Sequence, residues 1–463
     1  MGGTGLVACL TFCALGGSFV AALGTPMIPT MSGAFGVSLD DAQWTLTIAL
    51  LIGAVGTPLI SRWGDGGRRK RVLAATLILT VIGAALGAVA PNYGVLLLGR
   101  AFQGAGYGIA PVAIGIVREL MSGARMRRAV ATLSVTLAIG VGIGNPITGA
   151  FVTYVNFRAA FWFAAAFGLV SLLWLLAAVP DRISAGGRVR IDIPGALLLS
   201  AGLGAAMIAL SRGDSWGWAS APVLGLGGGG IAALIGWAAL ELRLANPLVD
   251  LRLAALPSVI GANAATVFLG VAMFGGTPML VRLMQTPTSM SYGLGATTFV
   301  AAMVLFLFSL GSLGSQFALA RLQAALGLRR LLPLAGVLVG VAWTVNAWVH
   351  VAVWQIALVH MIAGVGMGIA FAVLPLLITA AVPAERTASA NGLNTVIRLI
   401  GGTVGSTGIS AILTADTPAG AQYSAEAGYI IGGMVSAGAC FASAAIGWLF
   451  IRNADHADAR RAA

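Results

Sequence analysis

Long apolar segments recur along the whole chain, and each is separated from the next by a short loop. A helix that crosses a bilayer needs about 20 mostly apolar residues, and lipid offers no hydrogen-bond partner to a backbone that is not helical. We therefore expect an all-α polytopic membrane protein with 14 transmembrane helices. The expected spans are residues 5–30, 43–63, 72–91, 94–117, 129–152, 160–179, 194–211, 222–241, 258–281, 296–320, 331–349, 352–377, 391–413 and 428–451.

The composition argues against a soluble protein. Of 463 residues, 59% are hydrophobic and 9% are charged, whereas a soluble domain carries about 25% charged residues. The net charge is +12, but the arginines fall in short clusters between apolar segments and form no solvated basic face, so we expect no nucleic-acid partner. Cys9, Cys13 and Cys440 lie in apolar segments without metal-ligand spacing, and we expect no metal and no cofactor.

The loops differ in charge, and this difference predicts the orientation. With the N-terminus inside, 21 Arg and Lys residues fall in cytoplasmic loops and the C-terminal tail, whereas three (Arg158, Arg212 and Arg282) fall in outer loops. Cytoplasmic loops of membrane proteins carry an excess of Lys and Arg. Both termini are therefore expected on the cytoplasmic side.

The spans divide into six, two and six. The basic loop after the second span, TPLISRWGDGGRRKRVL (residues 57–73), is echoed after the tenth by ARLQAALGLRRLL (residues 320–332), with Gly before paired Arg in both. Repeated halves are typical of secondary transporters, whose site lies between the halves. We expect an N-terminal six-helix bundle over residues 1–180, a cytoplasmic linker with two extra transmembrane helices over 181–255, and a C-terminal six-helix bundle with a short cytoplasmic tail over 256–463.

Several motifs follow one another on the expected helices. The basic loop contains Pro58, Leu59, Arg62, Trp63 and Gly64, with Arg68 and Arg69 after an apparent insertion of Asp65, Gly66 and Gly67. The fourth span contains Arg100, Gln103 and Gly104, and the fifth contains GVGIGNPITGA with Gly140, Gly142, Gly144, Pro146 and Gly149. Together with LANPLVDLRL (244–253), GVGMGIAFAVLPLL (364–377) and ASANGLNTVIRLIGG (388–402), they make the chain resemble the major facilitator superfamily, specifically its fourteen-helix drug:proton antiporter branch.

The resemblance implies a major-facilitator-type fold of two six-helix bundles plus two linking helices. It also implies a secondary active transporter of the bacterial cytoplasmic (inner) membrane. The expected activity is export of amphipathic, drug-like or lipid-like small molecules by alternating access, with proton coupling left open. A membrane-embedded enzyme would need clustered Asp, His or Glu at one membrane face, and the sequence shows no such cluster, so no enzymatic activity is expected.

The motifs supply the candidate site residues. Arg100 lies inside a span, where a charge costs about 2.5–3.5 kcal/mol on insertion scales, so it should face a cavity or a polar partner, with Gln103 on the same side. The resemblance implies a role in coupling, and snorkelling to the interface remains an alternative. The basic loop (Ser61, Arg62, Asp65, Arg68, Arg69) is expected to fix the membrane topology and to contact anionic lipid headgroups or a neighbouring helix end. The alternative is that it fixes the topology alone.

The fifth span is expected to bend. Its glycines let backbones approach closely, and Pro146 removes a helical hydrogen bond. The resemblance implies a gating or sealing role, and packing alone is the alternative. The residues concerned are Gly140, Gly144, Asn145, Pro146 and Gly149.

The sequence departs from the family at its acids. Val20, Thr25 and Ser61 stand where this branch has Asp, Asn and Asp, and no carboxylate lies at mid-membrane. His360 is a candidate substitute, because His titrates near neutral pH. Thr11, Ser18 and Thr25 share one helical face by their spacing, and uncharged polar residues for a cavity are Ser18, Thr25, Asn263 and Asn346. Such a cavity favours neutral or amphipathic cargo over dications.

Two other functions stay open: a lipid transporter that is not proton-coupled, and a non-transporting membrane scaffold or sensor that kept the fold. The expected partners are a small-molecule or lipid substrate and membrane lipids with anionic headgroups at the cytoplasmic face. We expect a monomer.

Overall fold

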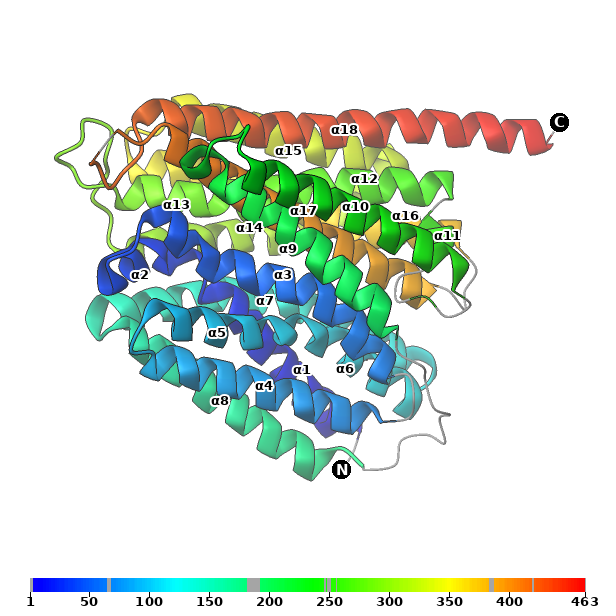
Figure 1. Ribbon diagram of the computed structural model, residues 1–463. Helices are drawn as coiled ribbons and strands as arrows, with labels where there is room; N and C mark the ends of the chain where they lie inside the picture. The colour runs from blue at the N-terminus through cyan, green and yellow to red at the C-terminus, as the bar shows by residue number, and fades with distance from the viewer. Residues whose placement is uncertain are drawn as a thin grey trace. The chain divides into compact units, whose positions relative to one another are not determined.

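The computed structural model describes residues 3–64, 68–180, 192–244, 247, 251–254, 256–382, 387–418 and 420–462, and the described residues form helices and connecting turns without a strand (Figure 1). The first helices are α1 (Gly3–Ala22), the 3₁₀ turn η1 (Thr25–Met27), α2 (Ile28–Phe35), α3 (Leu39–Gly64), α4 (Arg69–Val89), α5 (Tyr93–Gly104), the 3₁₀ turn η2 (Ala105–Gly108), α6 (Ile109–Leu120), α7 (Gly123–Tyr154) and α8 (Phe157–Ala178). They are followed by α9 (Ile193–Trp216), α10 (Ala221–Arg243), α11 (Leu251–Ala254), α12 (Pro257–Val271), the π-helix η3 (Ala272–Gly276), α13 (Thr277–Gln285), α14 (Thr298–Leu326), α15 (Leu328–Trp348), α16 (Val353–Ala381), α17 (Thr387–Ala415) and α18 (Glu426–Ala462).

The chain forms two compact units. Unit 1 contains Met1–Ser200 and Thr297–Phe306, and unit 2 contains Ala201–Ala296 and Leu307–Ala463. In unit 1, α1 packs against α7 and α8, α4 packs against α5 and α8, and α3 packs against α5. Apolar side chains from α1, α4, α6, α7 and α8 form its core, among them Leu10, Leu77, Ile116, Leu133 and Leu175.

Two asparagines start helices in unit 1. The side-chain oxygen of Asn92 accepts a hydrogen bond from Val95 N at the start of α5, and that of Asn156 accepts from Ala159 N at the start of α8. The first amides of a helix have no partner within the helix, and Asn is among the residues that supply one best. These caps fix where α5 and α8 begin.

Unit 2 repeats the pairing of unit 1. We number the six helices of unit 2 from α12 onward, with α12, η3 and α13 counted as one. The first then packs against the fifth (α17), as α1 packs against α7 in unit 1. The third (α15) packs against the fourth and sixth (α16 and α18), as α4 packs against α5 and α8. The repeat read from the two basic loops therefore has a counterpart in the packing.

The described helices account for eleven of the fourteen predicted spans. Eleven described helices are long and apolar enough to cross a membrane, and each corresponds to one of the predicted spans. The three other predicted spans contain α1, α5 with η2 and α6, and α7. The all-helical class is confirmed, whereas the count of fourteen transmembrane helices is not.

The first and fourth predicted spans are interrupted. The prediction of one helix over residues 5–30 is wrong, because α1 ends at Ala22 and η1 begins at Thr25. Pro26 and Pro29 lack the amide hydrogen that an uninterrupted helix would use. In the fourth span, η2 falls on Gly106 and Gly108, and glycine weakens a helix interior. Thr25 therefore does not share one helix with Thr11 and Ser18, so the predicted three-residue stripe is wrong at its last member.

Glycine contacts set how closely α4 and α5 pack. A Cβ on Gly99 would lie 2.6 Å from the carbonyl oxygen of Gly83 and 3.0 Å from the amide nitrogen of Gly87. Gly99→Ala should therefore lower the free energy of unfolding by about 1–3 kcal/mol, as overpacking does. Gly33→Ala is the matched control, because its Cβ would meet nothing within 4 Å. Thermal unfolding of the purified protein in detergent measures both, and equal melting temperatures would contradict the close packing.

Candidate functional site

Arg100 is buried in the middle of unit 1. It lies two turns inside α5, and 1% of its surface is exposed. Its Nε donates to the backbone oxygen of Thr45 on α3 at 2.8 Å, and its Nη1 donates to Oε1 of Gln103 at 2.6 Å. Both of these acceptors are uncharged oxygens, so the hydrogen bonds solvate the guanidinium without neutralising its charge.

The glycine of the same motif brings α5 close to α3. A Cβ on Gly104 would lie 2.7 Å from the carbonyl oxygen of Ala49 and 2.9 Å from Cβ of Ile52. Only glycine permits this approach, and the approach places the Thr45 carbonyl within reach of Arg100. The three residues thus act together: Arg100 carries the charge, Gln103 supplies one hydrogen bond to it, and Gly104 admits the helix whose Thr45 carbonyl supplies another.

The basic loop after α3 ties helix ends together. Arg69 Nη1 donates to the backbone oxygen of Gly115 on α6 at 2.7 Å and lies 2.9 Å from Oε2 of Glu119. Lys70 Nζ donates to the backbone oxygen of Leu176 in the last turn of α8 at 3.0 Å. Leu176 lies at the C-terminal end of α8, where unpaired carbonyls and a partial negative charge are stabilised by cations, whereas Gly115 lies inside α6.

Ser61 and Arg68, two other residues predicted to act in the basic loop, lie at the facing ends of α3 and α4. Arg68 precedes α4 and is exposed, and Ser61 lies half-buried in the last turn of α3. Asp65 lies outside the described residues, and so does the side chain of Arg62. That Asp65 replaces the acid missing at Ser61 therefore stays a prediction.

The glycines of α7 contact α1 within unit 1. A Cβ on Gly140 would collide with the side chain of Ser18, and one on Gly144 would lie 2.8 Å from Cβ of Ala22. Gly149 faces Ala302 at the start of α14, where its Cβ would be 2.6 Å from that of Ala302. Asn145 is buried, and Pro146 lies inside the helix. Gly140, Gly144 and Gly149 of the predicted gating residues thus lie where α7 approaches another helix closely.

Asn263 is joined to a partner that the sequence did not indicate. Asn394 on α17 donates its side-chain amide to Oδ1 of Asn263 at 3.0 Å and to Oγ1 of Thr266 at 2.7 Å, and all three residues are buried. This network lies within unit 2, where α12 packs against α17.

His360 is fully buried between two aromatic rings. Its ring centroid lies 4.9 Å from that of Phe308 and 5.9 Å from that of Trp343. Within the described part of the chain, neither ring nitrogen makes a hydrogen bond. A proton on this ring would have no acceptor among these residues, so the surroundings favour the neutral form.

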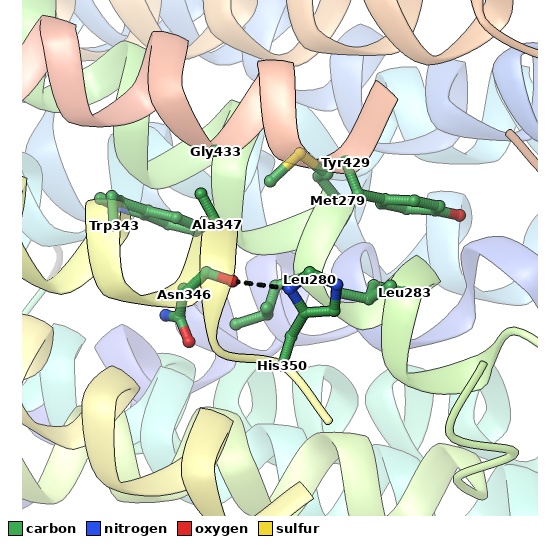
Figure 2. Close-up of a pocket in the computed structure, with 9 residues that line it drawn as sticks. All are labelled: Met279, Leu280, Leu283, Trp343, Asn346, Ala347, His350, Tyr429 and Gly433. Carbon is green, nitrogen blue, oxygen red and sulfur yellow. Dashed lines mark hydrogen bonds between the residues drawn. The ribbon is translucent and has the colours of Figure 1, made fainter. Parts of the chain in front are cut away.

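Asn346 lines a narrow pocket at one end of unit 2 (Figure 2). Met279, Leu280, Leu283, Trp343, Ala347, His350, Tyr429 and Gly433 complete the lining. Asn346 is 4% exposed, and its side-chain amide has no hydrogen-bond partner among the described residues. Its backbone oxygen lies 3.2 Å from Nδ1 of His350, which Figure 2 marks with a dashed line.

Arg282 is the cation that sequence reasoning misplaced. Arg282 was predicted in an outer loop, but α13 continues the preceding helix to Gln285 and so includes it. The Arg282 side chain is buried, with 2% of the residue exposed. Its Nη1 lies 3.4 Å from Oγ of Ser410, and its backbone oxygen accepts from Thr286. The available signal was the apolar spacing of TPMLVRLMQ, which extends the helical pattern by about one turn beyond residue 281.

The described residues include no group of three or more His, Cys, Asp or Glu side chains placed to hold a metal ion. Cys9, Cys13 and Cys440 are buried free thiols.

The comparisons with known proteins point to one family. The family model described as Major Facilitator Superfamily matches residues 7–406. The cephamycin export protein CmcT of Amycolatopsis lactamdurans is 29% identical over 253 residues, which cover 54% of this chain and 52% of that protein. The puromycin resistance protein pur8 of Streptomyces alboniger is 27% identical over 446 residues, which cover 92% of this chain and 86% of that protein.

Solved structures show the same fold. A crystal structure of peptide transporter POT in complex with sulfate matches with a TM-score of 0.70 at 16% identity, covering 97% of this chain and 94% of that one. At that identity the likeness concerns the fold alone. The sequence matches are also unequal in length, because this chain spans about half the length of CmcT and most of the length of pur8.

The helix-end contacts of the basic loop can be tested for stability. Arg69→Ala removes a charged hydrogen bond to the Gly115 carbonyl and leaves Glu119 without this cation. It should lower the free energy of unfolding by about 1–3 kcal/mol. Arg68→Ala removes an exposed charge from the same loop and serves as the control. Thermal unfolding of both variants in detergent is the measurement, and a loss in Arg68→Ala as large as in Arg69→Ala would contradict the specific role of Arg69.

Proposed function

Because this chain belongs to the Major Facilitator Superfamily, we propose that it is a secondary active transporter that exports amphipathic, drug-like or lipid-like small molecules by alternating access. The observation that carries the proposal is the family match over residues 7–406. The repeated helix pairing of the two units supports it, since repeated halves are the usual architecture of such transporters. A membrane enzyme has no such support from the described residues.

The relatives support a drug-like cargo. Two of them are named for cephamycin export and puromycin resistance, and these antibiotics differ in chemistry. A superfamily member related to both at 27–29% identity is therefore proposed to carry a small organic molecule rather than an inorganic ion.

The placement of acids favours neutral or singly charged cargo. In the eleven described spans, Asp and Glu lie only within three residues of a span end. The buried polar groups between these ends include the imidazole of His360 and the amides of Asn263 and Asn346, and α1 adds the hydroxyl of Ser18. Amides and hydroxyls bind neutral polar groups well. A dication would lack a carboxylate partner there.

We assign the coupling and gating roles to the predicted residues. Arg100 and Gln103 are proposed to respond to cargo or proton, since Arg100 places a cation inside unit 1 and Gln103 is hydrogen-bonded to it. Ser61, Arg62, Asp65, Arg68 and Arg69 are proposed to control the cytoplasmic ends of α3 and α4. Gly140, Gly144, Asn145, Pro146 and Gly149 are proposed to form the gate, and His360 and Thr25 are retained as lesser candidates.

The remaining proposals concern organisation and place. We propose transport bundles over residues 1–180 and 256–463, joined by a segment over 181–255 that contains α9 and α10. The charge asymmetry of the loops supports a bacterial inner-membrane protein with both termini in the cytoplasm. The exposed cation Arg68 supports contact with anionic headgroups at that face. We propose a monomer.

A second candidate is a lipid transporter that is not proton-coupled, and the observation that favours it is the absence of an acid at Val20 and Ser61. A non-transporting scaffold would share the same substitutions. Flux in proteoliposomes separates the three functions, since only the proton-coupled exporter responds to an imposed pH gradient and only the scaffold shows no flux.

Flux tests the cargo class directly. Purified protein in proteoliposomes should move puromycin, an amphipathic single cation, and a fluorescent phospholipid should be tested beside it. Propidium, a dication, should move much more slowly because the spans offer it no carboxylate. Propidium flux equal to that of puromycin would contradict the proposed cargo class, and no flux of any probe would contradict transport of these cargoes.

Arg100→Ala should reduce puromycin flux at least about tenfold, corresponding to about 1.4 kcal/mol or more, because it removes the buried charge. Arg100→Lys keeps a charge but cannot reproduce the two-directional hydrogen bonding to Thr45 and Gln103, so it should be intermediate. Both variants should still insert and purify as monomers, and Arg68→Ala serves as the control. Near-normal flux in Arg100→Ala would contradict a coupling role.

A further inference from the structure

The turn between α15 and α16 contacts the start of α18 through one buried imidazole. His350 lies in this turn, 5% exposed, and Glu426 is the first residue of α18. The His350 Nδ1 atom is 3.2 Å from the backbone oxygen of Asn346, and its Nε2 atom is 3.1 Å from Oε1 of Glu426. Both ring nitrogens are therefore at hydrogen-bond distance from oxygen atoms.

Counting donors shows that the two contacts can both be hydrogen bonds only with an additional proton. A backbone carbonyl and an ionised carboxylate can only accept hydrogen bonds, and a neutral imidazole has one donor. A neutral His350 beside an ionised Glu426 can therefore form one of the two bonds but not both. Both form only if the ring is an imidazolium or if Glu426 is protonated and donates to Nε2. In either case the pair holds one proton more than its ordinary neutral-pH forms.

Other charged and titratable groups lie close to this pair. Glu426 and Asp416 act on Tyr292, and Arg282 on α13 acts on Tyr423. Tyr429 lines the pocket beside His350, and Tyr292 and Tyr423 lie nearby on the connecting loops. On α16, the nearest titratable ring is His360, which contacts Trp343 of the same pocket.

Burial keeps the tyrosines of the two loops, Tyr292 and Tyr423, in their neutral form. Burial, followed by the influence of Tyr429, Glu426, Asp416 and Tyr423, raises the pKa of Tyr292 to about 12. Its hydroxyl donates to the backbone oxygen of Ser424. Burial also raises the pKa of Tyr423. His350 and Glu426 are the imidazole and the carboxylate of this cluster that contact each other directly.

We propose that His350 and Glu426 form a proton-binding site that joins the end of α15 to the start of α18. The proposal rests on the proposed function and deepens it, because this site supplies the titratable group that Val20 and Ser61 do not. In the proposed orientation it lies at the outer face, where protons enter during export. Loss of the proton breaks one of the two contacts and so weakens the link between the α15–α16 turn and the start of α18, which carries Tyr429 and Gly433 of the pocket.

The site can be tested without transport. The chain has three histidines, His350, His360 and His456, so ring-nitrogen and Glu side-chain carboxyl labels give few signals to follow by NMR in the full-length protein. His350 and Glu426 should titrate as one coupled pair. In Glu426→Gln the midpoint of His350 should move by about 1 pH unit or more. His456→Gln is the control. An identical His350 titration in wild type and Glu426→Gln overturns the proposal.

A flux experiment tests the coupling. In proteoliposomes, His350→Gln and Glu426→Gln should lose most of the acceleration of puromycin flux by an imposed pH gradient, while exchange of labelled for unlabelled puromycin without a gradient continues. If wild-type flux responds to the gradient and both variants respond equally, the proposal is overturned. If the wild type moves no probe but the paired titration is present, the proposed function fails and the proton-binding site stands.

Discussion

A positive charge in an apolar helix bundle must be solvated by the protein itself, and several described cations of this chain bind backbone oxygens. Arg69 binds a carbonyl of α6, Lys70 binds one in the last turn of α8, and Arg158 binds the oxygens of Ala88 and Ala90 at the end of α4. The last carbonyls of a helix lack partners within the helix. With 26 basic and 14 acidic residues, ion pairs alone could not serve every cation, so cations and helix ends satisfy each other.

A backbone oxygen also binds the buried cation Arg100 in unit 1. Arg100 is not at a helix end, so it needs an oxygen from a helix in mid-course, and Gly104 makes the Thr45 carbonyl reachable by letting α5 approach α3. Unit 2 uses glycines in the same way where α12 and η3 meet α17. A Cβ on Gly275 would lie 2.5 Å from the Gly405 carbonyl oxygen, and one on Gly270 would lie equally close to the Arg398 carbonyl oxygen. Close backbone approach is thus a shared device, which one unit uses to place a charge and the other to pack two helices.

Features that depend on residue type over long segments could be predicted from the sequence, whereas those that depend on backbone atoms could not. Apolar length gave the helical class and eleven of the spans, and the motif around Arg100 predicted that it would meet a polar partner. Thr45 left no such signal, because its carbonyl rather than its side chain binds Arg100. Pro26 and Pro29 did signal the break after α1, and the apolar length of the segment outweighed them in the prediction. Asn394 and Asn263 are 131 residues apart, and no local pattern joins them.

The position of a titratable group decides what a proton can do in such a protein. A carboxylate at mid-membrane would change the cost of burying charge in the cargo pathway itself. His350 and Glu426 instead lie where a loop meets the first turn of α18. A proton bound there changes the free energy of the contact between that loop and α18. A proton bound at such a contact acts by holding α15 and α18 together, and α15 and α18 are also the third and sixth helices that pack along each other in unit 2. Coupling of this kind requires no acid beside the cargo, so the acids missing at Val20 and Ser61 are compatible with a protonation-driven change in helix packing.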